Sequence, residues 1–345
     1  MEGNIVKRES VTVFLVKFVL LVILKEKGQL KQRKLKMKIL GIGNAIVDVI
    51  CKVKESFIEQ NNLTKGTMKL IFDDKEFKTM LSNLKIEKTI SGGSVANSIV
   101  GLSQLGNKVG FIGKVSDDEL GSKYEDGLKS ENVEYFYSKK KEELPTGTCL
   151  ILVTPDSERT MCTFLGTAGK INENDVNIEI VKKTEMIFLE GYLWDEGEPK
   201  KAFEKAIKNA NKVAMSLSDQ FCVDRHKQHF LDLVKNKLDI IFSNEQEIMS
   251  LIDAKNFRDV IDFGKNLKKL LIVSRGDKGA ISINGDEVVE NGVEKNLSIK
   301  DLTGAGDLFA SGFLHGNINN LSSIECLDKG RQMSSKVIQQ IGARL

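Results

Sequence analysis

The sequence contains few of the residues that build metal, redox or disulfide sites. Its 345 residues include five scattered cysteines and three histidines, and no two cysteines have C-x-x-C spacing. An odd number of dispersed cysteines is typical of a reducing compartment, so we expect a cytoplasmic protein. His226 and His229 form the closest pair of histidines. Their polar surroundings predict a solvated helix face rather than a metal site.

The sequence also lacks a strong charge of either sign. Its formal net charge is +3, and the first 36 residues alone hold nine Lys/Arg against three Asp/Glu. The remainder is therefore slightly acidic, which gives no sign of a nucleic-acid partner. The Walker A pattern G-x-x-x-x-G-K-[ST] is absent, and this argues against phosphate binding by a P-loop.

No apolar run is long enough to span a membrane as a helix. The longest, Val11–Leu24, has 14 residues, whereas a spanning helix needs about 20. A signal peptide would need a small-residue cleavage site, yet the first alanine is Ala45. From Met37 the sequence changes to a pattern typical of a buried strand. We predict that residues 1–36 are an extension outside the fold of a domain spanning 37–345; the alternative is a short amphipathic membrane anchor.

From Met37 onward, apolar runs alternate with amphipathic segments. Continuous runs such as Ile39–Gly43 and Met186–Leu189 predict buried parallel strands. Segments such as Val95–Leu105 predict helices. This alternation predicts an α/β fold with a doubly wound, mostly parallel sheet and helices on both faces. The alternating pattern of 146–165 predicts a hairpin, which would join short strands from about 50–72 in a small separate sheet.

The most distinctive stretch is Asp-Leu-Thr-Gly-Ala-Gly-Asp at 301–307, which runs into an apolar helical pattern. A glycine turn at a helix start points N–H groups at one spot, where the helix potential favours an anion. Asp307 would repel an anion, but it could take a proton from the group that attacks it. The stretch predicts phosphoryl transfer, with the N–H groups of Gly304, Ala305 and Gly306 stabilising the transferred group. The simpler interpretation is a glycine turn with an aspartate N-cap.

Two polar pairs elsewhere allow both a structural and a functional interpretation. Asn44 and Asp48 are four residues apart, which on one strand would place both on the same face. Asp48 lies between two valines, so it needs either a structural partner or ligand hydroxyls to hold. Asn244 and Glu247 have the spacing of a helix capping box, which alone would explain both residues.

The stretch 301–307 resembles the signature D-T-x-G-A-G-D of the ribokinase-like (PfkB) family of sugar and nucleoside kinases. Leu302 stands where the family commonly has threonine. Further segments resemble other motifs of this family, in the family's order: Ser91–Asn97, Gly113–Gly121, Asn244–Glu247 and Arg275–Gly279. The resemblance covers nearly all of residues 37–345.

The resemblance implies an ATP-dependent kinase of the ribokinase-like fold, in which the small sheet is a lid that excludes water. Asp307 would be the base, and Gly304, Ala305 and Gly306 would stabilise the phosphoryl group. The substrate would be held by Asn44, Asp48, Gly92, Gly93, Asn97 and, on closure, Arg159. ATP and Mg²⁺ would be held near Asn244, Glu247, Arg275, Gly276, Gly279 and Thr303, with Mg²⁺ bound largely through water near Glu247 and K⁺ near Asp301.

Three segments look most similar to the adenosine-kinase branch of the family: Ser216–Phe221, Ile240–Glu247 and Val337–Gly342. This implies phosphorylation of a primary hydroxyl, with adenosine converted to AMP; ribose, fructose and 2-keto-3-deoxygluconate stay open as acceptors. A nucleoside needs an apolar slot, which Phe221, Trp194 or Phe164 could line unless they are core residues. A nucleoside-binding sensor without catalysis is the non-enzyme alternative. We expect small-molecule partners and a monomer or homodimer.

Overall fold

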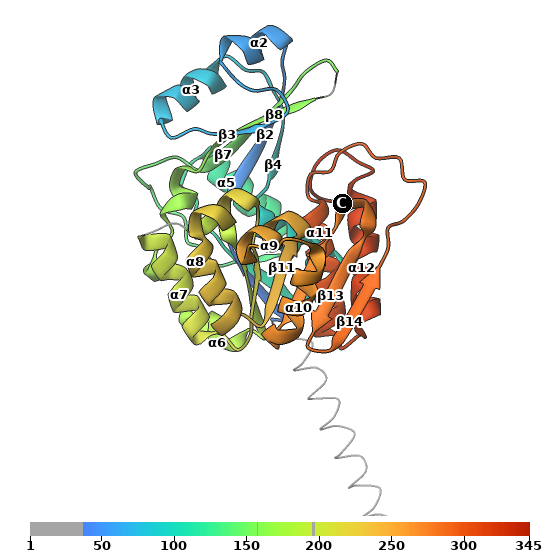
Figure 1. Ribbon diagram of the computed structural model, residues 1–345. Coiled ribbons are helices and arrows are strands. Elements are labelled where there is room, and N and C mark those ends of the chain that lie inside the picture. Colours follow the sequence, from blue (N-terminus) through green and yellow to red (C-terminus); the bar gives the residue numbers. More distant parts are fainter. Residues whose placement is uncertain (1–36, 157, 195–196) are drawn as a thin grey trace, which may run out of the picture. The chain divides into compact units, whose positions relative to one another are not determined.

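The computed structural model describes residues 37–345 except 157, 195 and 196. The predicted N-terminal extension, residues 1–36, therefore lies outside the described residues. The described chain forms a nine-stranded sheet and a five-stranded sheet, with α-helices against both faces of the larger one (Figure 1). The predicted α/β fold is confirmed.

The larger sheet has the strand order β14-β13-β12-β11-β10-β9-β1-β5-β6. Its strands from β6 to β12 pair in parallel, whereas β13 is antiparallel to both of its neighbours. The bounds are β1 Ile39–Ile42, β5 Val109–Ile112, β6 Glu134–Tyr135, β9 Met186–Glu190, β10 Val213–Ser216, β11 Ile240–Asn244, β12 Leu270–Ser274, β13 Ala280–Asn284 and β14 Glu287–Asn291.

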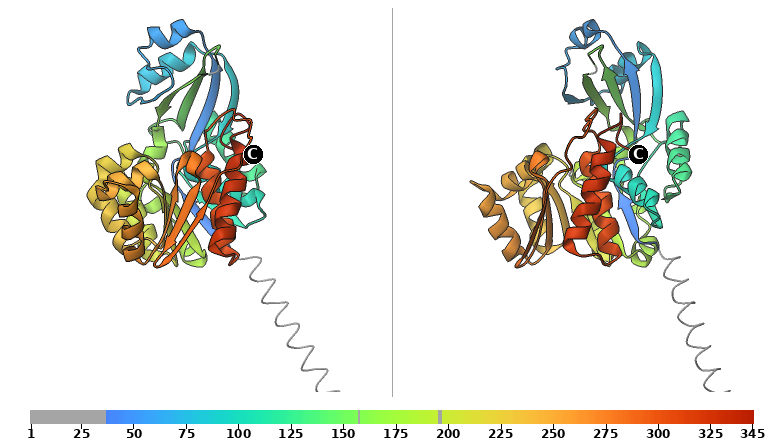
Figure 2. Two further views of the ribbon diagram at one scale, coloured as in Figure 1. Left: turned by 45° about the vertical axis from the view of Figure 1, so that its right-hand side comes forward. Right: turned by 90° about the vertical axis from the view of Figure 1, so that its right-hand side faces the viewer.

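Both faces of this sheet are buried, because successive side chains of a strand point to opposite faces. Ile39 and Met186 pack in one apolar cluster with residues of α4, α5, α11 and α12. Leu40 and Ile187 pack in the other, with residues of α7, α8, α9 and α10. Figure 2 shows α11 and α12, in red, side by side. The helices are α4 Ser94–Gln104, α5 Glu119–Ser130, α6 Ile178–Lys183, α7 Glu198–Asn209, α8 Gln220–Asn236, α9 Glu245–Ile252, α10 Phe257–Leu267, α11 Ala305–Ile318 and α12 Ser323–Val337, with 3-10 turns η1 Gly166–Lys170, η2 Glu173–Asp175, η3 Gly191–Leu193 and η4 Gly276–Lys278.

The five-stranded sheet has the order β3-β8-β7-β2-β4. Its strands are β2 Ile46–Lys52, β3 Met68–Leu70, β4 Ile86–Ser91, β7 Gly147–Val153 and β8 Arg159–Phe164, and helices α2 Glu55–Gln60 and α3 Asp74–Ser82 accompany it. Strands β7 and β8 form an antiparallel hairpin. Between 50 and 72 the chain holds the end of β2, one helix and the three-residue strand β3. Strand β4 has no counterpart in the sequence prediction, because half of its six residues are exposed and the strand lacks a clear apolar alternation.

The chain passes from one sheet to the other between Ile42 and Ile46. Asn44 lies in this crossing and Asp48 lies in β2. The idea that both residues share the face of one strand is therefore wrong. A strand ends and a new one begins in another sheet, and a local pattern of apolar residues does not reveal that change of sheet.

His226 is buried at a kink inside α8, where its backbone leaves helical geometry. The prediction of a solvated face is therefore wrong for His226 and holds for the exposed His229. Among the residues that the structure describes, no group of three or more His, Cys, Asp or Glu side chains could hold a metal. No helix within the described part of the chain is long and apolar enough to cross a membrane.

Candidate active site

The site lies where the strand order of the larger sheet reverses. Strand β1 is flanked by β5 on one side and by β9 on the other, and doubly wound sheets bind ligands at the carboxyl ends of such strands. Asn44, just after β1, donates its backbone N–H to Glu190 at the end of β9, with an N···O distance of 2.8 Å. The N–H of Val95, in the first turn of α4, donates to the other oxygen of Glu190 at 3.0 Å. One carboxylate therefore ties together β1, β9 and α4.

Glu190 was missed in the sequence analysis. Burial raises its pKa to about 7, although its two backbone hydrogen bonds favour the ionised form. A Cβ at Gly43 would lie 2.6 Å from the Glu190 carboxylate, so the glycine leaves room for this side chain. The signal in the sequence is a glutamate at the end of the apolar run Met186–Glu190. A carboxylate next to a buried strand needs hydrogen-bond partners, so Glu190 could have been identified as a site residue.

The glycine turn before α11 brings Asp307 to the wall of a cavity. Gly304 is the N-cap residue with φ +79°, and a Cβ there would lie 2.6 Å from Cα of Ala343. Asp307 accepts a hydrogen bond from the Ser94 hydroxyl at 2.6 Å and another from Nδ2 of Asn97 at 3.0 Å. Burial raises the pKa of Asp307, and these two donors act in the opposite direction. The carboxylate is thus fixed in place beside the N–H groups of the turn.

The cavity has a volume of about 910 Å³, which is within the usual range for small-molecule sites. Most of the predicted site residues line it, although they come from distant parts of the chain. They are Asn44, Asp48, Gly93, Asn97, Asn244, Glu247, Thr303, Gly304, Ala305, Gly306 and Asp307.

Two acceptors line the cavity wall where the chain passes between the sheets, Asn44 in the crossing itself and Asp48 in β2. Oδ1 of Asn44 is buried and accepts no hydrogen bond from any described residue. Burial raises the pKa of Asp48 to about 7; the charges of Arg344 and Arg159 act to lower it, and that of Asp307 acts to raise it. An unpaired buried acceptor such as Oδ1 of Asn44 is costly, and a ligand hydroxyl would satisfy it.

Several predicted residues support the cavity from outside it. Gly92 leaves room for Asp48, because a Cβ there would lie 2.5 Å from Oδ2 of that carboxylate. Arg159, at the start of β8, pairs with Asp301 at an Nη1···Oδ2 distance of 2.6 Å. Asp301 also accepts the backbone N–H groups of Thr303 and Gly342.

The predicted nucleotide loop is the η4 turn between β12 and β13, and its residues do not line the cavity. Arg275 pairs with Glu245 at 3.0 Å and stacks over the ring of Phe257. Gly276 and Gly279 both have positive φ angles, which this turn requires.

Asn244 and Glu247 form the capping box that their spacing predicts. Glu247 accepts the backbone N–H of Asn244 at 3.0 Å and its Nδ2 at 2.5 Å. Burial is the main cause that raises the pKa of Glu247 to about 7, and the nearby charge of Asp219 acts in the same direction. Because both carboxylate oxygens of Glu247 are engaged in the cap, Glu247 and the nearby Asp219 fit a magnesium ion held through its water ligands rather than by direct contact.

Two exposed aromatic rings line the cavity. Phe221, at the start of α8, is 82% exposed, and Phe72, after β3, is 85% exposed. Phe72 was missed because its loop carries no recognisable pattern. Trp194 and Phe164 are 2% and 4% exposed and do not line the cavity, so they are core residues and their proposed place in a base slot is wrong.

Comparison with known proteins assigns the chain to a family. Residues 42–345 match the model of the pfkB family carbohydrate kinases, and the chain belongs to this family. It is therefore a kinase with an alcohol group as acceptor.

Its fold is similar to solved structures of that kind. These include the adenosine kinase from Sinorhizobium meliloti, with 36% identity, a TM-score of 0.81 and coverage of 90% of this chain and 96% of that one. A probable sugar kinase from Rhizobium etli CFN 42 has 35% identity, a TM-score of 0.82 and coverage of 90% and 95%. Among curated proteins, the 5-dehydro-2-deoxygluconokinase of Mesomycoplasma hyopneumoniae (strain 7448) is 26% identical over 278 residues, covering 75% of this chain and 81% of the relative.

Proposed function

We propose that the protein transfers the terminal phosphoryl group of ATP to the primary, 5′-type hydroxyl of a ribose-containing acceptor, with adenosine converted to AMP. The observation that carries the proposal is the position of Asp307. Its carboxylate lies on the cavity wall in the first turn of α11, directly after the glycine turn. The carboxylate proposed as the base therefore lines the same cavity as the turn whose N–H groups are proposed to bind phosphate; among these, the N–H of Ala305 also donates to the carbonyl of Leu302 at 3.1 Å.

In the proposed reaction, Asp307 takes the proton of the acceptor hydroxyl as its oxygen attacks the terminal phosphorus. The bond from that phosphorus to the bridging oxygen breaks, and ADP leaves. The N–H groups of Gly304, Ala305 and Gly306 stabilise the charge on the moving phosphoryl group. Ser94 and Asn97 hold the Asp307 carboxylate during this step, through the contacts of 2.6 Å and 3.0 Å.

Asn44 and Asp48 would bind the hydroxyls of the ribose ring. Oδ1 of Asn44 needs a donor, and the half-buried carboxylate of Asp48 would accept two hydroxyls. Gly93 allows this approach, because its φ of +97° and a Cβ position 2.2 Å from the Asn44 carbonyl oxygen exclude any side chain. Arg159, at the start of β8 in the five-stranded sheet, would contact the phosphates with its guanidinium.

Magnesium, when bound, would neutralise charge on the phosphate oxygens. Asn244, Glu247 and the neighbouring Asp219 would hold its water ligands. Thr303 lines the cavity beside the glycine turn and would contact the phosphates. The η4 turn would support the cavity wall without contacting ATP directly. Its conformation is fixed by Arg275, Gly276 and Gly279.

Adenosine is favoured over a free sugar by the apolar side of the cavity. Phe72 and Phe221 present exposed rings there, and Met68, Ile151 and Met161 also line it. An aromatic base would bury this surface, whereas a sugar would leave it in water. The similarity to the adenosine kinase of Sinorhizobium meliloti supports the same choice.

A sugar kinase is the second candidate, with ribose, fructose, 2-keto-3-deoxygluconate or 5-dehydro-2-deoxygluconate as acceptor. The curated relatives named 5-dehydro-2-deoxygluconokinase support this candidate, as does the probable sugar kinase of Rhizobium etli CFN 42. A nucleoside-binding sensor would use the same wall without turnover.

An ATP-consumption assay across adenosine, inosine and the four sugars tests the proposal. We expect turnover with adenosine, and phosphorus NMR should identify the product as the 5′-phosphate. Turnover confined to a sugar would select the second candidate. Nucleoside binding by calorimetry without turnover of any acceptor would select the sensor.

We also propose a K⁺ ion near Asp301, which would have to share the carboxylate with Arg159. Turnover should then be higher in K⁺ than in tetramethylammonium at equal ionic strength. Equal rates in the two salts would reject the ion.

A further inference from the structure

The segment that follows α12, residues 338–345, runs back along the glycine turn. The backbone N–H of Asp301 donates to the carbonyl of Ile338 at 3.2 Å, and the N–H of Gly342 donates to Oδ2 of Asp301 at 2.7 Å. Ala343 lies against Gly304 and lines the cavity. The next residue, Arg344, is thereby placed behind the proposed acceptor site.

The guanidinium of Arg344 makes two hydrogen bonds to the segment Ser91–Asn97. Nε donates to Oδ1 of Asn97 at 2.9 Å, and Nη1 donates to Oγ of Ser91 at 2.7 Å. Arginine can only donate, and an ionised carboxylate can only accept. With Arg344 at its oxygen, the Asn97 amide must therefore turn its Nδ2 toward Asp307, where it donates at 3.0 Å.

The charge of Arg344 also acts on the carboxylates of the site. It lowers the pKa of Asp48 and of Asp307, in opposition to the effect of their burial. The other charged or titratable groups that face Arg344 are Tyr124 and Glu131. Two further charges act on these aspartates. Arg159 lowers the pKa of Asp48, and Asp307 and Glu190 are close enough for the charge of Asp307 to raise the pKa of Glu190.

We propose that Arg344 is a positioning residue for phosphoryl transfer. It orients the Asn97 amide that holds the base, and it places a positive charge behind Asp48 and Asp307. The inference rests on the proposed function, because it assigns Arg344 to the same site. It gives residues 338–345 a role in activity beyond packing.

The two parts of this role can be separated with two substitutions. Arg344→Gln removes both the charge and the fork of donors, whereas Arg344→Lys keeps the charge but cannot bridge Asn97 and Ser91 with the same geometry. Arg331→Gln is the matched control, because Arg331 lies on α12 and pairs with Asp328 and Glu294. We would measure kcat and KM for ATP and the acceptor from about pH 4.5 to about pH 9, a range that starts near the ordinary carboxyl pKa of about 4 and extends upward, because burial raises the pKa of Asp307.

We expect Arg344→Gln to lower kcat by about 10- to 100-fold, which is what the loss of a charge-assisted hydrogen bond corresponds to. In a plot of kcat against pH, the fall of kcat on the acid side (the acid limb) should move to higher pH. The reason is that the base binds its proton more tightly without the neighbouring cation. Arg344→Lys should lower kcat with an acid limb close to that of the wild type. Arg331→Gln should resemble the wild type in both respects.

An unchanged kcat in Arg344→Lys, or an acid limb in Arg344→Gln that superimposes on that of the wild type, would overturn the proposal. If Arg344→Gln does not fold, Arg344→Lys alone decides through its kcat. A carbon-13 NMR titration of labelled aspartates, with Asp307→Asn for assignment, follows the pKa of the base without turnover. This titration tests Arg344 even if the wild type phosphorylates none of the acceptors, in which case the proposed function fails separately.

Discussion

Asp307 is the residue at which the proposed chemistry can be tested most directly. Asparagine has nearly the same shape but cannot accept the proton of the acceptor. We predict that Asp307→Asn lowers kcat by about 10²- to 10⁴-fold, the usual contribution of a general base. The dissociation constant of the acceptor should change only a few-fold, and calorimetry would measure it beside the steady-state rates.

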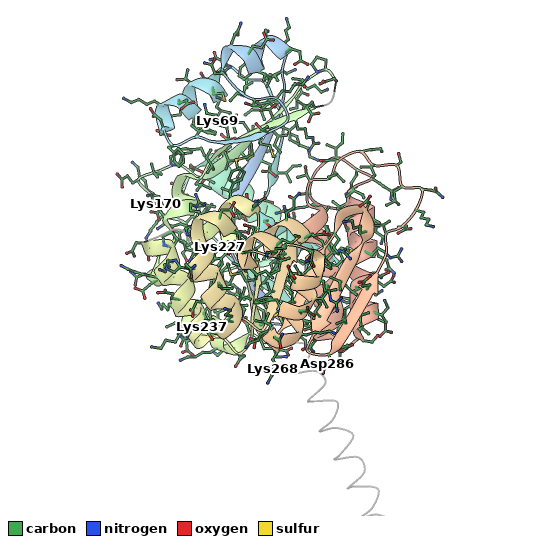
Figure 3. All side chains as sticks on the ribbon, in the orientation of Figure 1. Lys69, Lys170, Lys227, Lys237, Lys268 and Asp286 are labelled. Carbon is green, nitrogen blue, oxygen red and sulfur yellow. The ribbon has the colours of Figure 1, made fainter. Side chains whose placement is uncertain are left out.

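A suitable control is Asp286→Asn. Asp286 is exposed, and Figure 3 shows it with Lys268 at the end of the larger sheet remote from the five-stranded sheet. This variant should keep the wild-type rate. A kcat for Asp307→Asn within tenfold of the wild type, at about pH 8, would contradict the assigned role.

Asp48 gives a prediction for the pH dependence of stability. Its pKa is about 7 in the folded protein against a model value of 3.8. The folded state therefore binds the proton more tightly than the unfolded state, so Asp48 lowers the free energy of unfolding as pH rises from about 4 to about 7. Asp48→Asn removes this effect, which should amount to a few kcal/mol at most.

Urea unfolding at about pH 5 and about pH 8 would measure this difference, as both pH values bracket the upper part of the transition. Relative to the wild type, the Asp48→Asn variant should be more stable at the higher pH than at the lower one. Asp286→Asn, at an exposed site, should leave the difference between the two pH values as in the wild type. An equal change for Asp48→Asn at both pH values would show that Asp48 is not buried as an acid.

At the scale of elements, the two glycines before and within α11 have different reasons to be glycine. Gly304 has φ +79° and no room for a Cβ, whereas Gly306 has no heavy atom within 4 Å of a built Cβ. We predict that Gly304→Ala lowers the free energy of unfolding by about 1–3 kcal/mol, the cost of a strained backbone. Gly306→Ala should keep the stability or raise it by up to about 1 kcal/mol, because alanine favours a helix over glycine. It should raise the KM for ATP, because its methyl group would enter the cavity.

Chemical unfolding and steady-state kinetics on both variants would test this contrast. Each variant is the control of the other, since both add one methyl group to the same turn. If Gly306→Ala were the less stable of the two, the packing described for the turn would be wrong.

The elements that could be predicted from sequence are those whose signal is local. Continuous apolar runs predicted buried strands such as β1 and β9, and the Asn-x-x-Glu spacing predicted the cap of α9. Strand β4 could not be predicted, because its pairing with β2 depends on a partner distant in sequence. The crossing between β1 and β2 was missed for the same reason.

The candidate site shows the same division. Asp307 and the glycine turn are adjacent in sequence, so their chemistry could be predicted from one heptapeptide. Glu190 and Arg344 act on residues about 95 and 250 positions away, and no spacing rule links such distant residues. Phe72 could not be identified because its environment depends on how the five-stranded sheet meets the cavity.

At the scale of the whole described domain, one ion pair joins the five-stranded sheet to the glycine turn. Arg159 begins β8, and its guanidinium contacts Asp301, whose side chain is 6% exposed. Asp301 in turn holds Thr303 and Gly342. The position of this sheet is therefore coupled to the turn that would bind the phosphate.

This coupling predicts that Arg159→Ala lowers kcat/KM for both ATP and the acceptor. It also predicts that more of the terminal phosphate of ATP is lost to water. Without Arg159, the part-buried Asp301 loses its ion-pair partner and the glycine turn loses a support, so we expect kcat/KM to fall by about tenfold, which corresponds to about 1.4 kcal/mol of transition-state stabilisation. A site that closes less completely admits water. The ratio of ATP hydrolysed to acceptor phosphorylated should therefore rise, and parallel measurements of ADP and of the phosphorylated acceptor would give this ratio.

Lys69→Ala provides the control within the same sheet. Lys69 lies on β3 (Figure 3) and pairs with Glu76 at the surface, where an ion pair contributes about 0–1 kcal/mol. Lys69→Ala should keep both kcat/KM and the ratio of hydrolysis to transfer. If Arg159→Ala behaved in the same way, the ion pair with Asp301 would be a static contact, and the five-stranded sheet would have no part in excluding water.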